Sequence, residues 1–212
     1  MTILLEAIRW IIDNPGSFFT AFNQHMLMCA ISLGIALVIA IPLGFAVARR
    51  PGAAFVSVNI AGSLRSIPSL AILAAAMPLL GIGLWPSVLA LIVLAIPPLL
   101  LNTIVGIREI DPALLDAARG MGMGKREILW QIEFPLAVPS MIAGIRTSAI
   151  QVIGGAALAS FIGGGGLGDF INAGIAIMNM PRLIVGALPI ALLAIFAEVF
   201  FGWLERTLTL RR

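Results

Sequence analysis

The chain has 212 residues, of which 60% are hydrophobic and 11% are charged, and its formal net charge is +3. Soluble domains carry roughly 25% charged residues, so this composition excludes an ordinary soluble domain and indicates an all-α integral membrane protein. The basic residues lie at the ends of hydrophobic runs and form no basic face interleaved with aromatic residues, which argues against a nucleic-acid partner. Cys29, the single cysteine, is interpreted as a packing residue, because one thiol builds neither a disulfide framework nor a cysteine-based metal site.

The amino-terminal segment, residues 1–21, is predicted to be amphipathic and to lie at the membrane interface. Residues 3–12 are apolar but too short to span a bilayer, and charged residues interrupt them. Asn14-Pro15-Gly16 is expected to end this helix. A sixth membrane span is the alternative interpretation. The segment shows no small-residue cleavage site, so it is not interpreted as a signal peptide.

The transmembrane domain, residues 22–212, is predicted to contain five membrane spans, each long enough for the roughly 20 residues that a crossing requires. His25, at the outer end of the first span, is interpreted as an interfacial hydrogen-bonding residue, since there is no second histidine to complete a metal site. Pro97-Pro98 is expected to interrupt the third span. The five predicted spans are residues 22–48, 53–80, 87–105, 138–161 and 183–204.

The second span is unusual because polar residues and a proline fall near its middle, namely Arg65, Ser66, Pro68 and Ser69. A guanidinium at mid-membrane costs several kcal/mol unless it faces protein or water. A proline there frees the carbonyl about one turn earlier, near Leu64, for a neighbouring helix, a hydroxyl or a water. Two interpretations stay open. Arg65 either snorkels or pairs with the freed carbonyls, or it belongs to a transport pathway or gate.

A glycine-rich stretch at residues 163–168 satisfies a GxGxxG pattern, but a nucleotide site is rejected there. No strand is predicted before it, no βαβ unit surrounds it, and no Lys-Ser/Thr pair completes a phosphate-binding loop. The stretch is instead predicted to be a flexible re-entry at the outer face, followed by a short amphipathic segment up to Met180-Pro181.

The orientation is predicted from basic residues near the ends of the spans. One side carries Arg49, Arg50, Arg108, Arg119, Lys125, Arg126, Arg206, Arg211 and Arg212, whereas the other carries only Arg9 and Arg182. With the first set inside, five spans put the amino terminus outside and the carboxyl terminus in the cytoplasm. The polar loop at residues 106–138 then lies in the cytoplasm.

This loop is the longest polar interruption of the chain. Asp111 is a good N-cap and Pro112 is a favoured first helical residue, so a short helix is predicted up to Arg119. Three alternating glycines then disfavour helix, each by roughly 1 kcal/mol relative to alanine. A second helix is predicted from Lys125 towards Phe134, punctuated by Pro135 and Pro139. Composition alone would equally fit a solvated loop.

The spacing within the loop resembles the Glu-Ala-Ala loop of ABC-importer permeases. Asp116-Ala117-Ala118 is followed by Gly122 and then by Ile132, Phe134 and Pro135. Two positions depart conservatively, since aspartate replaces glutamate and Phe134 replaces leucine. The resemblance implies that the loop docks onto a cytosolic ATPase. The residues that it implies for this contact are Leu115, Asp116, Ala117, Ala118, Gly120, Met121, Gly122 and Lys125.

Over most of the chain, the motifs GIREIDPALLDAARGMGMG, IEFPLAVPSMIAGIRTS, GIGLWP and GGGGLGDF resemble permeases of osmoprotectant importers, which take up glycine betaine, choline and carnitine. The SIPSL motif is also similar to the five-span methionine-importer permeases. Both groups imply the type I permease fold. They also imply a second permease subunit, either an identical copy or a paralogue, two cytosolic ATP-binding subunits, and an extracytoplasmic substrate-binding protein. The resemblance gives this chain no catalytic residue, metal or cofactor of its own, because ATP and Mg are bound by the partner ATPase.

Two other classes of function fit the sequence less well. A secondary transporter or channel would usually show ionisable residues within its spans and repeated halves. Here Arg65, Arg146 and Glu198 are the only firm intramembrane candidates, and no internal repeat is evident. An intramembrane enzyme would need a nucleophile with its base or a metal cluster, and the single histidine and cysteine provide neither.

Polar residues within the spans are candidates for the transport pathway if two permeases pair through their second, third and fourth spans. The alternative for each is an interhelical hydrogen bond. Arg146 and Glu198 are predicted to lie at nearly equal depth and to pair across adjacent antiparallel spans, or else each serves a separate role. The candidate pathway residues are Arg65, Ser66, Ser69, Asn102, Thr147 and Gln151. The protein is predicted to be a multi-pass protein of the cell membrane, surrounded by lipid.

Overall fold

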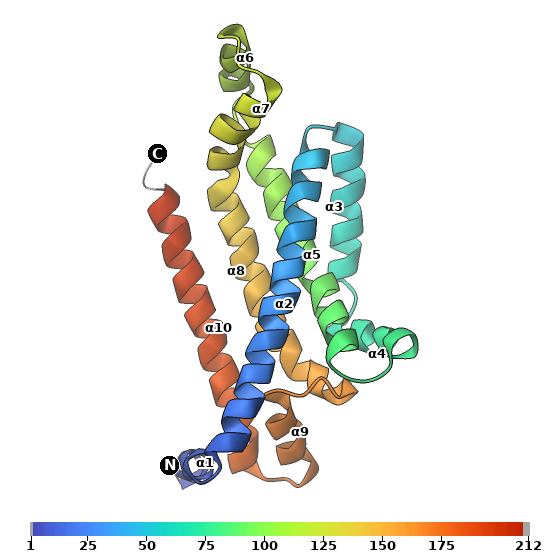
Figure 1. Ribbon diagram of the computed structural model, residues 1–212, viewed down its shortest axis with the longest axis vertical. Coiled ribbons are helices and arrows are strands. Elements are labelled where there is room, and N and C mark those ends of the chain that lie inside the picture. Colours follow the sequence, from blue (N-terminus) through green and yellow to red (C-terminus); the bar gives the residue numbers. More distant parts are fainter. Residues whose placement is uncertain (1, 210–212) are drawn as a thin grey trace.

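The computed structural model describes residues 2–209, apart from the side chain of residue 79, and the regular elements of this part are all helices. Arg211 and Arg212, which the predicted orientation used, lie outside the described residues. The long helices run along one axis of an elongated bundle (Figure 1). The elements are α1 (Thr2–Asp13), α2 (Pro15–Ala48), α3 (Pro51–Arg65), α4 (Ser69–Leu80), α5 (Leu84–Arg108), α6 (Pro112–Gly120), α7 (Lys125–Ile128), a π-helical turn (Leu129–Glu133), α8 (Phe134–Ala159), a 3₁₀ turn (Ser160–Ile162), α9 (Gly168–Ala176) and α10 (Met180–Thr209).

The predicted number of spans agrees with the structure. Within the described residues, four helical stretches are long and apolar enough to cross a membrane, and a bent helix pair makes a fifth span if its halves are counted together. The four stretches are α2, α5, residues 125–162 and α10, and the bent pair is α3 with α4. The fold is therefore all-helical with four to five membrane spans, as the sequence predicted.

The second span is not the continuous helix that its hydropathy predicted. α3 ends at Arg65, α4 begins at Ser69, and the two helices are bent by 93° at this break. Pro68 has no N–H to continue the helical ladder, and the residue before a proline avoids the helical region. The carbonyl of Leu64 is not left for a neighbouring group, because it accepts the backbone N–H of Ile67 at 3.2 Å. Arg65 thus lies at a helix end and not in the middle of a helix.

Other prolines do not act as the breaks that were predicted. α5 continues through Pro97-Pro98 without interruption. The helix after Lys125 does not stop at Pro135 or Pro139 but runs through the π-helical turn into α8. At the amino terminus α1 ends at Asp13 as predicted, yet α2 already begins at Pro15. Proline is favoured at the first turn of a helix, where its missing N–H costs nothing.

The core lies between α2, α5 and α8, where small and polar residues allow close approach. The Ser148 hydroxyl on α8 donates to the carbonyl of Ala95 on α5 at 2.8 Å. Gly44 on α2 faces Thr103 on α5 so closely that a Cβ there would lie 2.6 Å from the threonine methyl. Small residues serve this role in membrane bundles because they let helix backbones approach each other. α10 packs on α8, and α3 and α4 lie at the edge of the bundle (Figure 1).

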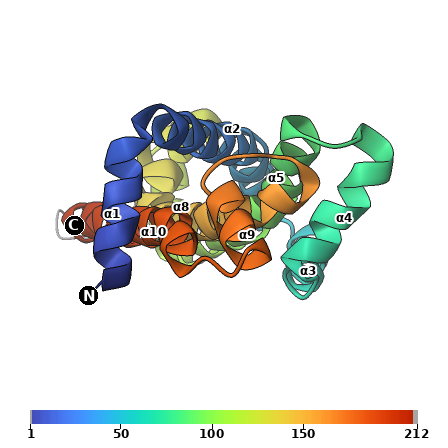
Figure 2. The ribbon, with the colours of Figure 1, turned by 90° about the horizontal axis from the view of Figure 1, so that it is seen from below.

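One end of the bundle, the glycine end, consists of α1, residues 162–168 and α9 (Figure 2). The amide group of Gln24 on α2 holds the glycine-rich stretch, since it donates to the carbonyl of Gly164 at 3.1 Å and accepts from the N–H of Gly166 at 3.3 Å. Residues 164–168 are buried. The stretch is therefore packed against α2, and its buried backbone leaves no exposed cradle for a phosphate.

Candidate functional site

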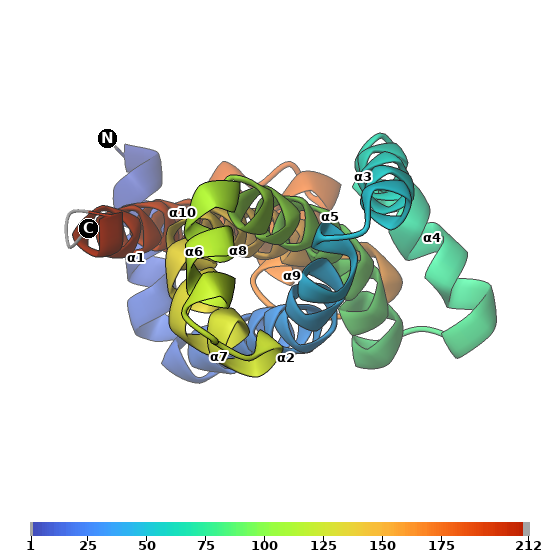
Figure 3. The same cartoon turned by 90° about the horizontal axis from the view of Figure 1, so that it is seen from above.

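The polar loop forms a compact helical module at the opposite end of the bundle, the loop end, which carries residues 109–133 (Figure 3). The Asp111 carboxylate caps α6 by accepting the N–H of Ala113 at 2.8 Å. Gly122 adopts φ +84°, which only glycine adopts readily, and so allows the turn between α6 and α7. The Glu127 carboxylate then accepts the N–H of Gly124 at 2.7 Å and starts α7. The predicted helix, bend and helix are all present.

The module has a small hydrophobic cluster of its own, separate from the main core. Ile110, Leu115, Ala118 and Ile128 are buried together. Leu115 and Ala118, two of the residues implied to contact an ATPase, therefore face into the module and hold its helices together. The other six are exposed or partly so, namely Asp116, Ala117, Gly120, Met121, Gly122 and Lys125. The side chain of Met121 is 76% exposed, so an apolar group is presented outward at the tip of the loop.

The six candidate pathway residues are spread over four helices. Arg65 and Ser66 are exposed at the break between α3 and α4, and Ser69 begins α4. Asn102 donates to the carbonyl of Pro98 at 2.8 Å, and Thr147 donates to that of Ala143 at 3.0 Å, so both are satisfied within their own helices. Within the described part of the chain, no hydrogen bond joins any two of the six.

Arg146 on α8 contacts two carboxylates on α10. Its Nη1 atom lies 3.8 Å from Oε1 of Glu198 and 3.3 Å from Oε2 of Glu205. Sequence reasoning chose Glu198 from its depth and missed the nearer Glu205, which lies two turns further along the same helix. Gly202 lies between the two glutamates, and a Cβ there would be 3.2 Å from Nη1. The spacing of Glu198, Gly202 and Glu205 at three and four residues, which puts all three on one helix face, was a signal that could have revealed this arrangement.

His25 was interpreted as an interfacial hydrogen-bonding residue; its depth in the membrane stays a prediction, and the hydrogen bonding is not found among the described residues. Its side chain is fully buried on α2 against Gly166, and neither ring nitrogen makes a hydrogen bond with the described residues. α2 is also longer than predicted, so that ten of its residues precede His25 instead of three. Cys29 is buried as predicted, and its thiol contacts the carbonyl of Val152 at 3.9 Å.

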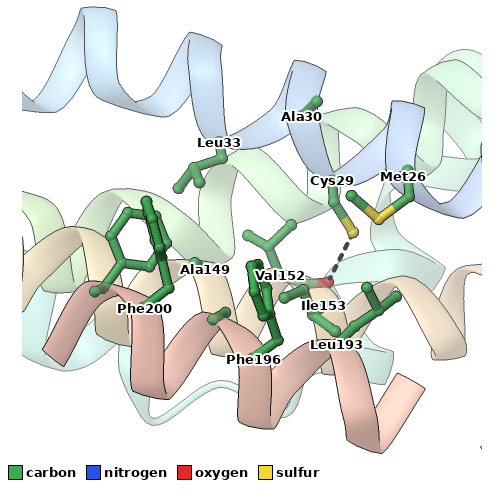
Figure 4. Close-up of a pocket in the computed structure, with 12 residues that line it drawn as sticks. Met26, Cys29, Ala30, Leu33, Ala149, Val152, Ile153, Leu193, Phe196 and Phe200 are labelled. Atoms are coloured by element: carbon green, nitrogen blue, oxygen red, sulfur yellow. Dashed lines mark hydrogen bonds between the residues drawn. The ribbon is translucent and has the colours of Figure 1, made fainter. Parts of the chain in front are cut away.

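The hollow beside Cys29 does not have the composition of a polar solute site. It has a volume of about 260 Å³, lies between α2, α8 and α10, and is lined by apolar side chains such as Leu33, Phe196 and Phe200 (Figure 4). Solute sites usually add a few convergent polar groups to an apolar lining. No group of three or more His, Cys, Asp or Glu within residues 2–209 is placed to hold a metal ion.

The fold and the loop module together define the class: a multi-pass membrane protein with a compact helical module at one end of its bundle. The chain belongs to the family described as the binding-protein-dependent transport system inner membrane component, whose family model matches residues 36–210. It is accordingly a transport subunit of the cell membrane and a permease component of an ABC importer.

Three relatives show how closely the chain matches within this family. It is 42% identical to the carnitine transport permease protein OpuCD of Listeria monocytogenes, over 98% of this chain and 94% of the relative. It is 39% identical to the glycine betaine/carnitine/choline transport system permease protein OpuCB of Bacillus subtilis, over 96% and 94%. It is 35% identical to the osmoprotectant import permease protein OsmW of Salmonella typhimurium, over 97% and 98%.

Solved structures support the same fold. A subunit of the inward-facing MetNI methionine ABC transporter matches with a TM-score of 0.80 at 22% identity, over 91% of this chain and 96% of that one. A chain of an amino acid ABC transporter solved with histidines matches with a TM-score of 0.69 at 17% identity, over 95% and 97%. At these identities the likeness concerns the fold and not the substrate.

Proposed function

We propose that this chain, paired with a second permease subunit, forms the pathway by which a small quaternary ammonium osmolyte crosses the membrane. The candidate solutes are glycine betaine, choline and carnitine, because relatives named for these solutes match nearly the whole chain at 35–42% identity. An extracytoplasmic binding protein delivers the solute, and two cytosolic subunits bind and hydrolyse ATP with Mg. The observation that carries the mechanism is the α6–α7 module, a separately packed helical element with an exposed outer face.

The module docks on the ATPase through Asp116, Ala117, Met121 and the turn at Gly122. The side chain of Ala117 is a single methyl group, so another helix or a groove can approach α6 closely at this point. Lys125, exposed at the start of α7, adds a positive charge to the module. Asp116 and Arg119 form an exposed ion pair on α6, with Nη1 and Oδ1 2.7 Å apart. Leu115 and Ala118 support docking indirectly, because they keep α6 and α7 in position.

The basic residues support an orientation with the loop end in the cytoplasm. Among the described residues near span ends, seven of the nine cations belong to the loop end, and only Arg9 and Arg182 belong to the glycine end. Cytoplasmic segments carry the excess of lysine and arginine in membrane proteins. The amino terminus is then outside and the carboxyl end of α10 is inside.

Docking is tested by replacing Ala117 with tryptophan and measuring how much ATPase subunit co-purifies with the permease. We expect the variant to insert into membranes but to lose the ATPase, since the indole would occupy the contact surface. Ala176→Trp is the matched control, because Ala176 is also exposed on a short helix but lies at the glycine end. Normal ATPase binding and solute-stimulated hydrolysis in Ala117→Trp would refute the docking surface.

The pathway is tested by accessibility. Non-helical backbone at membrane depth is stable only where protein covers it or water reaches it, and residues 66–68 are exposed in the single chain. In a Cys29→Ala background, Ser66→Cys and Ser69→Cys should react with a water-soluble thiol reagent in at least one nucleotide state of the complex. Ser148→Cys is the buried control and should not react. If both test positions stay unreactive in every state, this elbow does not line the pathway.

The solute is tested by uptake into proteoliposomes that contain the complete transporter. Glycine betaine, choline and carnitine are compared with methionine, the substrate suggested by the other resemblance. We expect ATP-dependent uptake of at least one quaternary ammonium solute. Uptake of methionine alone would reject the proposed solute class and leave the importer function in place.

A further inference from the structure

The α6–α7 module is attached to the bundle at few places. Its buried cluster is separate from the main core, and the chain enters it from α5 and leaves it through the π-helical turn Leu129–Glu133. Two contacts join the end of α2 to the junction between this turn and α8, one an ion pair and the other an aromatic contact. These contacts connect the module to a helix that is distant from it in sequence.

The first contact is the ion pair between Arg49 and Glu133. Nε of Arg49 donates a hydrogen bond to Oε1 of Glu133 at 2.9 Å, across 84 residues of sequence. The side chains of Arg49 and Glu133 are 37% and 14% exposed, whereas both partners of the Asp116–Arg119 pair are more than 60% exposed. Attraction between charges strengthens as water is excluded, so the Arg49–Glu133 pair fixes the relative position of its partners more firmly than a surface pair does.

The second contact lies one residue further along the chain from Glu133. The ring of Phe134 stacks on Phe45 with centroids 6.0 Å apart and also contacts Trp130 at 5.3 Å. Phe45 lies in the last turn of α2, and Arg49 is the residue that directly follows this helix. Glu133, the last residue of the turn, and Phe134, the first residue of α8, therefore contact Arg49 and Phe45 at the end of α2, and this fixes the end of α2 against the start of α8.

The exit turn is the part of this connection that is best able to deform. The N–H of Phe134 bonds to the carbonyl of Leu129, five residues earlier, in place of the usual four. Such π-helical turns are rare and are found frequently at functional sites. This turn connects the module to α8, and Glu133 is its last residue. Ile132 of the turn and Leu136 of α8 pack against the buried cluster of the module.

We infer that Arg49 and Glu133 are positioning residues for coupling: their ion pair makes α2 follow the α6–α7 module when an ATPase moves it. This inference rests on the proposed docking of the ATPase on that module. Without the pair, part of a movement of the module is absorbed by the π-helical turn, and α2 follows only through its packing on α8, which includes the Phe45–Phe134 stack. With the pair, the same movement is passed to α2 and to the connected α3.

The test uses the complete transporter in proteoliposomes and measures the solute transported per ATP hydrolysed. Arg49→Gln and Glu133→Gln should each lower this ratio roughly fivefold or more, the lower range of typical coupling between sites. ATPase association and the thermal midpoint should stay near wild type. The reversed pair, Arg49→Glu with Glu133→Arg, should recover at least half of the ratio. Arg50→Gln is the matched control, since this neighbouring exposed arginine forms no ion pair with the described residues.

Three results would overturn the inference. The first is an unchanged ratio in both single variants, and the second is a reversed pair that is as impaired as the single variants. The third is loss of ATPase association in the single variants, which would mean that the ion pair supports only the fold of the module. Failure of the proposed docking function looks different. In that case Ala117→Trp retains the ATPase subunit. Any fall in the transport ratio of Arg49→Gln then has a cause other than transmission from this module.

Discussion

The two ends of the bundle are held together by different physical means. At the loop end, a module with its own small core is joined to α2 through an ion pair and stacked rings. At the glycine end, backbones touch directly. A Cβ at Gly186 would lie 2.5 Å from the carbonyl oxygen of Leu167, and one at Gly174 would lie 2.5 Å from the backbone nitrogen of Leu183. Trp10 adds an edge-on contact with Phe170 that holds α1 in place.

This difference indicates which end can move. Direct contacts between backbones leave little room for movement, because closely packed atoms cannot shift without creating a clash or a void. An ion pair and a π-helical turn can be broken and re-formed while the helices around them stay intact. The loop end is thus suited to passing on a movement, and the glycine end to resisting one. The predictions below test this contrast, beginning with the largest expected effect.

Replacing Gly186 with leucine should prevent stable folding. The new side chain would overlap the backbone of Leu167 and Ile171, and we expect a loss of at least about 3 kcal/mol, the upper range for overpacking. The control is Gly154→Leu on α8, where a Cβ would meet no neighbouring atom within 4 Å. Yield of folded permease in detergent and its thermal midpoint are the measurements. Equal stability of the two variants would contradict direct backbone packing at the glycine end.

Replacing Arg146 with methionine should destabilise the protein by about 2 kcal/mol. This is less than the 3–5 kcal/mol typical of a fully buried ion pair, because Arg146, Glu198 and Glu205 are all partly exposed. The cause is that Glu198 and Glu205 lose their cation. Adding Glu205→Leu should recover more stability than adding Glu198→Leu, because Glu205 is nearer and its Oε2 atom is buried without a hydrogen bond. Thermal midpoints of the three variants decide this, and the reverse order of recovery would refute the assignment.

The smallest effect is expected at Asp169, a residue at the start of α9 whose side chain is only partly removed from water. Partial burial raises the pKa of its carboxyl group above the ordinary value of 3.8, so the folded protein disfavours the charged form. Stability from this group is complete below pH 3.8 and is lost as the pH rises through the raised pKa. The thermal midpoint of Asp169→Asn, relative to that of the wild type, should therefore increase as the pH rises. A gain with falling pH would show instead that the helix dipole of α9 dominates.

Sequence alone determined the features that depend on composition and local pattern. Apolar runs of sufficient length predicted the spans, because a bilayer accepts little else at that length. Asp111, Pro112 and the alternating glycines predicted the helix, bend and helix of the module, because caps and positive φ angles are local properties. The spacing from Asp116 to Pro135 was enough to identify the family.

Only the tertiary structure decided how these pieces contact one another. The helix is interrupted at Pro68, whereas α5 continues through Pro97-Pro98. This difference depends on neighbouring helices, which no local sequence pattern describes. Arg49 and Glu133 meet across 84 residues, and Gln24 binds the glycine-rich stretch across about 140. Arg146 lies nearer to Glu205 than to Glu198, and its guanidinium passes close to Gly202 between them. Such pairings follow from how α2, α8 and α10 pack, which the sequence encodes only through the whole fold.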